Sequence, residues 1–119
     1  MSRRAIPTPG DGRAPVRLSK ARLLAMIEEA AVDAYGEGEQ ATGLFTMLEE
    51  HLVLPFETKV LGATVTVTNI ELRNGVQIVA ICIRGRDRQA ISVLDLALPS
   101  PRPVGSEWIE AYRCWCAGR

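Results

Sequence analysis

Apolar residues recur at helical spacing in two stretches near the start of the chain. After Ser19, a residue type that caps helices well, apolar side chains recur every three or four positions over residues 20–34, and the glycines that follow are expected to end the helix. A second helical pattern runs from about residue 40 to 52, although Gly43 weakens it by about 1 kcal/mol relative to alanine. The pattern therefore predicts two amphipathic helices.

Beyond Pro55 the spacing of apolar residues changes to two, and β-branched side chains dominate four successive runs. Asn74-Gly75 separates two of these runs and predicts a tight hairpin, because a type I′ turn needs positive φ at both central residues. Gly85 and Asp87 indicate a second, looser hairpin. The four runs predict an antiparallel sheet.

The apolar pattern of residues 67–83 also predicts that this sheet bends. Between Val67 and Ile70 the apolar positions change parity, which a regular strand cannot place on one face, so a bulge is expected near Asn69. Residues 78–83 are apolar on both faces, so the helices are expected to cover one side while the other lines the interior of a curled sheet. A small, partly open barrel is the resulting expectation.

The chain is expected to close with a short helix. Prolines at 99, 101 and 103 end the strands, and Ser106 is expected to cap a helix whose Trp108, Tyr112 and Trp115 tie it to the sheet. The predicted fold class is α+β, in which N-terminal helices and a short C-terminal helix pack on a curved antiparallel sheet of four or five strands. Residues 19–117 form this single domain, and residues 1–18, rich in Pro, Gly and Arg, are expected to be a disordered basic tail.

Composition limits the classes of function. Fourteen basic side chains balance fourteen acidic ones in 119 residues, so the protein has no overall field for nucleic acid, anionic membranes or cations. No apolar run approaches the roughly 20 residues that span a bilayer, and the N-terminus has no apolar secretory region, so a cytoplasmic protein without membrane contact is expected.

The residues that usually carry catalysis are sparse. His51 is the only histidine and stands in no triad motif, so we expect a protein that is not an enzyme. Cys82, Cys114 and Cys116 form neither a disulfide framework nor two spaced zinc pairs, so buried or free thiols are the simpler interpretation.

Several segments in a fixed order resemble one known family. They are LEEHLVLPFETKVLGATVTV, IVAICIRG, QAISVLDLALP and GSEWIEAYRCW, within roughly residues 48–115. Together they resemble the CcbP-like family of small calcium-binding proteins known from cyanobacteria. The resemblance implies that the protein binds Ca²⁺ as a cytosolic buffer or sensor, through surface carboxylates rather than an EF-hand loop. The candidate ligands are Glu49, Glu50, Glu57, Asp95, Glu107 and Glu110.

Each of these carboxylates also has an ordinary interpretation. The glutamates at 49, 50 and 57 suit the solvated side of a helix or strand, and Asp95 suits either a structural hydrogen bond or a site. The alternative function is a non-enzymatic module that presents its sheet edge or the Arg84–Arg88 loop to a protein or nucleic-acid partner. Six aromatic residues, mostly in predicted helices, argue against a nucleic-acid partner and leave a protein partner open.

Overall fold

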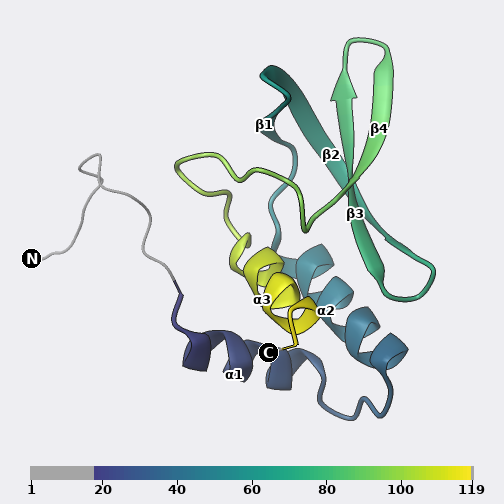
Figure 1. The fold of residues 1–119 in the computed structure, drawn as a ribbon, viewed down its shortest axis with the longest axis vertical. Coiled ribbons are helices and arrows are strands. Elements are labelled where there is room, and N and C mark those ends of the chain that lie inside the picture. The colour runs from purple at the N-terminus through teal and green to yellow at the C-terminus, as the bar shows by residue number, and fades with distance from the viewer. Residues whose placement is uncertain (1–17, 119) are drawn as a thin grey trace, which may run out of the picture.

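The computed structural model describes residues 18–118, so the predicted tail lies outside the described residues except for Leu18, which packs against the core. Three helices gather at one end of the molecule, and a four-stranded sheet extends away from them (Figure 1). The α+β class is therefore confirmed. In chain order the elements are α1 (Lys20–Ala30), α2 (Glu37–His51), β1 (Phe56–Val60), β2 (Ala63–Arg73), β3 (Gln77–Arg84), β4 (Asp87–Ser92) and α3 (Glu107–Cys116).

The first two helices form where the pattern predicts them, with different ends. The Ser19 side chain accepts a hydrogen bond from the Arg22 N–H at 3.1 Å, which confirms the predicted cap. The first helix ends at Ala30, four residues early, because the chain turns through Asp33 at φ 66°. The second begins at Glu37, after Gly36 in the N-cap position, and Glu39 in its first turn accepts from the Tyr35 N–H at 2.7 Å.

Gly43 has a packing reason that outweighs its low helix propensity. A Cβ at this position would overlap the backbone carbonyl of Ala30 at the end of α1. The glycine therefore lets α1 and α2 cross in close contact, which a helix propensity scale does not register.

The sheet has the order β1-β2-β3-β4 with every neighbouring pair antiparallel. Asn74 and Gly75 have φ of 54° and 76°, so the predicted tight turn is confirmed. The pairing of β2 with β3 shifts between Val67 and Asn69, which confirms the predicted bulge. This bulge returns Val67 and Ile70 to the same buried face of the sheet.

The expected barrel is wrong, because the sheet is open. β1 and β4 stand at opposite edges and do not pair with each other. The last strand also ends at Ser92 and not near residue 99 as predicted, because residues 93–95 form a turn. The chain therefore leaves the sheet without pairing with β1. Val79 and Ile81 are nevertheless buried on the face of β3 opposite the helices, as the apolar run predicts.

The last helix ties the two parts of the fold together. The Tyr112 hydroxyl accepts from the Ile78 N–H at 3.2 Å and donates to the Val76 carbonyl at 2.8 Å, at the start of β3. The Trp115 indole donates to the Gln40 side chain on α2 at 2.9 Å. The predicted attachment to the sheet is confirmed for Tyr112, whereas Trp108 stacks on His51 of α2 and Trp115 binds Gln40 of α2. Ser106 occupies the N-cap position without a side-chain cap hydrogen bond. Within residues 18–118 no helix has both the length and the apolar character needed to cross a membrane.

Candidate metal centre

The acidic residues of this protein are concentrated in one stretch of the chain. Between Arg22 and Lys59 there is no lysine or arginine, but there are eight carboxylates. Seven of them belong to α1, α2 and the connection between these helices, namely Glu28, Glu29, Asp33, Glu37, Glu39, Glu49 and Glu50. A count over the whole chain conceals this stretch, because the balancing arginines lie elsewhere.

The end of α2 meets the start of α3, and this junction brings distant residues together. His51 stacks on Trp108 with ring centroids 6.0 Å apart and an interplanar angle of 16°. The Val53 N–H donates to the Val104 carbonyl at 2.9 Å. Gly105, at φ 88°, lies so close to the His51 carbonyl that a Cβ would overlap it. The backbone of this junction is therefore fixed by tight contacts.

Three of the six predicted ligands flank this junction. Glu49 and Glu50 are exposed in the last turn of α2, and Glu107 is exposed in the first turn of α3. The C-terminus of a helix carries partial negative charge, so the α2 end adds to the field of its two carboxylates. Among the described residues, no lysine or arginine forms an ion pair with any of the three, and only His51 approaches Glu50, at 3.9 Å.

Asp95 and Glu110 have arginine neighbours instead. Glu110 pairs with Arg102 at 3.3 Å. Arg113 donates to the Val93 carbonyl at 2.9 Å and to the Leu96 carbonyl, so it holds the turn in which Asp95 lies. Burial lowers the pKa of Arg113, the Glu110 carboxylate opposes that shift, Arg102 adds to it, and Asp95 also opposes it. These two carboxylates already balance basic groups.

Glu57 lies apart from the other candidates. It is exposed on β1 and borders a pocket of about 390 Å³ together with Lys59, Thr64 and the segment 97–99. The neighbouring Thr58 points to the buried face and donates to the Ala97 carbonyl at 2.5 Å. Glu57 is the single acidic residue among those that line this pocket.

Across residues 18–118, no three His, Cys, Asp or Glu side chains stand close enough together to hold a metal ion. The donor chemistry of the junction suits Ca²⁺, which prefers carboxylate and carbonyl oxygens and accepts irregular geometry. Glu49, Glu50 and Glu107 are exposed, so each carboxylate is accessible to an ion in solution.

The remaining chemically active side chains form no centre of their own. Cys82, Cys114 and Cys116 are all free thiols in the described part of the chain. Burial raises the pKa of the Cys82 thiol, as expected of an inert cysteine under the sheet.

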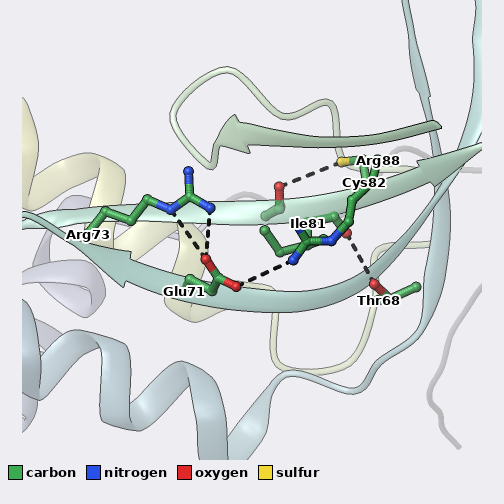
Figure 2. A network of polar contacts seen from close by, with 7 residues as sticks. Thr68, Glu71, Arg73, Ile81, Cys82 and Arg88 are labelled. Atoms are coloured by element: carbon green, nitrogen blue, oxygen red, sulfur yellow. Dashed lines mark hydrogen bonds and ion pairs between the residues drawn. The ribbon is translucent and has the colours of Figure 1, made fainter.

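The sheet carries a group of arginines, two of which lie around Glu71 (Figure 2). Glu71 on β2 accepts from Arg73 at 2.9 Å and lies 3.7 Å from Arg88 on β4. Arg84 and Arg86 are exposed in the β3–β4 hairpin and have no ion pair among the described residues. The arginine loop is therefore only partly neutralised by the acidic residues around it.

Comparison with known proteins identifies the class of protein to which this fold belongs. A family model described as calcium binding matches residues 25–116, so the chain belongs to the CcbP family of calcium-binding proteins. The crystal structure of Anabaena CcbP resembles it with a TM-score of 0.67 at 21% identity, covering 88% of this chain and 96% of that chain. No curated protein sequence matches the chain. The family resemblance noted in the sequence is thus confirmed and extends over α2 and most of α1.

Proposed function

We propose that the protein binds Ca²⁺ through exposed carboxylates of its helical layer, with Glu49, Glu50 and Glu107 as the first ligands. The observation that carries this proposal is the stretch from residue 23 to 58, which holds eight carboxylates and no lysine or arginine. It supplies a local negative field although the formal net charge is zero. Membership of a calcium-binding family supports the same ion.

The junction offers fewer carboxylates than a full calcium shell. Ca²⁺ takes roughly six to eight oxygens, so water and backbone carbonyls complete the coordination in this proposal. Asp95 and Glu110 stay secondary candidates because Ca²⁺ would have to compete with Arg102 and Arg113 for them. Glu57 is a third, separate candidate. A cytoplasmic location and a role without catalysis belong to the same proposal.

The experiment is a calorimetric titration of the whole protein with CaCl₂ at near-physiological salt, repeated with MgCl₂. We expect saturable Ca²⁺ binding in the natural protein. The combined change Glu49→Gln, Glu50→Gln and Glu107→Gln removes three negative charges, leaves one neutral amide oxygen at each position without changing side-chain size, and is expected to weaken binding at least about tenfold. A flat trace with the natural protein would end the calcium proposal.

A matched control removes the same charge at the other end of the acidic stretch. The combined change Glu28→Gln, Glu29→Gln and Glu37→Gln also removes three exposed carboxylates, and it leaves Glu39, which caps Tyr35, in place. We expect it to weaken binding only a few-fold, through the general field. Equal losses in both variants would indicate a diffuse ion atmosphere, and a larger loss in the control would move the site to the α1–α2 connection.

Trp108 provides a second measurement at the proposed site. It stacks on His51 at the junction, whereas Trp115 lies at the other end of α3 against Gln40. In a Trp115→Phe variant, the remaining tryptophan emission should change on Ca²⁺ addition with the same midpoint as the calorimetric curve. A large spectral shift supports a sensor that rearranges on binding, and binding without a shift supports a buffer.

A further inference from the structure

The end of the sheet farthest from the helices has a surface unlike the rest of the protein. We call it the distal end: the β1–β2 turn, residues 60–63, together with the β3–β4 hairpin, residues 84–89. Figure 1 shows both turns projecting beyond the helical layer, while the β2–β3 turn points back towards α2. The helices therefore leave the last part of the sheet face uncovered.

An apolar trough of about 330 Å³ opens on this uncovered face. Strand alternation and the strand register place Val60, Val65, Cys82 and Ile91 on the same face as the helix-covered core, so they form its lining. Arg84 borders the trough on β3. Ligand pockets in proteins usually have volumes of about 300 to 1,000 Å³, so the trough has room for one or two aliphatic side chains of a partner.

Leu61 at the edge of this trough is in an unfavourable conformation for its residue type. Its φ is 50° and that of Gly62 is 82°, nearly the same as the 54° and 76° of Asn74 and Gly75 in the other tight turn. Type I′ turns favour Asn or Asp at the first of these positions, because a bulky side chain is strained there. Leu61 is also 102% exposed, so it buries nothing within the described chain. Neither folding nor solubility accounts for a leucine at this position.

The charges around the trough select the partner. Arg84 on the rim and Arg86 in the exposed turn stand beside one acidic residue, Asp87, which also borders the trough. Arg88 is not part of the rim, because the register places it on the opposite face of the sheet, where it lies near Glu71. A partner with carboxylates beside an aliphatic side chain is complementary to this rim, whereas a basic partner is repelled. A concave apolar trough also fits an inserted side chain better than it fits a flat bilayer surface.

We propose that the distal end binds an extended acidic peptide segment of another protein. In this proposal an aliphatic side chain of the segment enters the trough against Val65 and Cys82, Leu61 covers it, and carboxylates of the segment pair with Arg84 and Arg86. This binding does not depend on the calcium proposal, because it uses none of the candidate metal ligands.

The experiment titrates the isotopically labelled full chain with synthetic heptapeptides and follows its amide NMR signals. The probe alternates glutamate with leucine, and two control peptides replace all leucines by serine or all glutamates by lysine. We expect saturable shifts at Leu61, Cys82 and Ile91 with the first peptide only. Absence of binding, equal binding of the three peptides, or shifts confined to the helical layer would overturn the proposal.

Leu61→Asn is the informative variant because it separates binding from folding. Asparagine suits the turn better, so the variant should unfold at a slightly higher temperature and bind the peptide about tenfold more weakly. Val32→Asn removes another exposed aliphatic side chain, between α1 and α2, and should leave binding unchanged. Arg84→Glu combined with Arg86→Glu should abolish the preference for the acidic peptide. Unchanged binding in Leu61→Asn would overturn the proposal.

Further measurements distinguish a peptide from two other occupants of the trough, namely a second copy of the chain and a membrane surface. Sedimentation of the natural protein and Leu61→Asn at the same concentrations should give monomers for both. A dimer that needs Leu61 would assign the trough to a second copy of the chain instead. Co-sedimentation with vesicles of anionic phospholipid that needs Leu61 would assign it to a membrane surface, and either result would overturn peptide binding.

Discussion

The helical layer and the distal end of the sheet carry opposite charges. Residues 20–51 hold seven carboxylates against two basic side chains, whereas the hairpin at residues 84–89 holds three arginines against one aspartate. The zero net charge of the chain therefore arises because oppositely charged regions cancel, and it does not describe the charge of either region. The charge that matters to a bound ion or peptide is the charge within about 10 Å of it, because salt screens the rest.

The two regions also differ in how they are held. The helical layer is fixed by close backbone contacts and by hydrogen bonds from α3, including Trp115 to Gln40. The distal end has exposed turns, and its Arg88 makes only a surface ion pair, with Glu71. Substitutions in the first region should therefore reduce the free energy of unfolding far more than comparable substitutions in the second.

The largest effect is expected from one methyl group at the α2–α3 junction. Gly105→Ala should lower the free energy of unfolding by more than about 3 kcal/mol, because the new Cβ overlaps the His51 carbonyl and φ is positive. Gly85→Ala at the distal end also has positive φ but meets nothing within 4 Å, so it should lower that energy by only about 1 kcal/mol. Urea unfolding of both variants measures the difference, and similar values would contradict a tightly packed junction.

An intermediate effect is expected where α3 joins the sheet. Tyr112→Phe should lower the free energy of unfolding by about 1 to 3 kcal/mol, since it leaves the buried Ile78 N–H without its acceptor. Burial raises the pKa of Tyr112 from 10.0 to about 12, and a raised pKa favours the protonated folded state. The contribution of the protonated Tyr112 hydroxyl to the free energy of unfolding is thus complete below pH 10 and is lost as the pH rises towards 12.

Unfolding curves of the natural protein and Tyr112→Phe between pH 8 and pH 12 test this shift, and the interval covers the usual and the raised pKa. The variant should lose less stability over that interval, so the two curves should converge at high pH. Parallel pH profiles would show that the Tyr112 hydroxyl does not couple folding to its protonation.

The smallest effect is expected in the ion-pair network on the outer face of the sheet. Glu71→Gln removes the carboxylate between Arg73 and Arg88, and it should lower the free energy of unfolding by less than about 1 kcal/mol because all three side chains are partly or largely exposed. The difference should shrink further in 1 M NaCl, where the Debye length is about 3 Å. A loss of several kcal/mol that persists in salt would mean that this network is structural.

Local chemistry explains why much of the fold could be predicted from the sequence. Ser19, Asn74-Gly75 and the parity change near Asn69 each act over a few residues, and the structure confirms the cap, the hairpin turn and the bulge. The β1–β2 turn was not predicted as a type I′ turn, because Leu61 is a poor residue for one. Barrel closure failed because it depends on strand lengths and on the turn after Ser92, which periodicity does not set.

The candidate metal ligands were predicted from a family resemblance, and they remain a prediction. The sequence could not show which of these carboxylates lie near one another. Glu50 and Glu107 are 57 positions apart, and only the α2–α3 junction makes their helices neighbours. The sequence does contain a signal for the acidic helical layer, namely the absence of lysine and arginine between residues 23 and 58. Net charge alone hides that stretch.

The attachment of α3 to both earlier parts of the fold has a consequence for biosynthesis. Its contacts reach back 75 residues to Gln40 and 34 residues to Ile78. A ribosome releases the chain from the N-terminus onwards, so α1, α2 and the sheet emerge with their apolar faces uncovered until residues 107–116 are free. The nascent chain should therefore need protection by chaperones until late in translation, and it should become resistant to protease in one step.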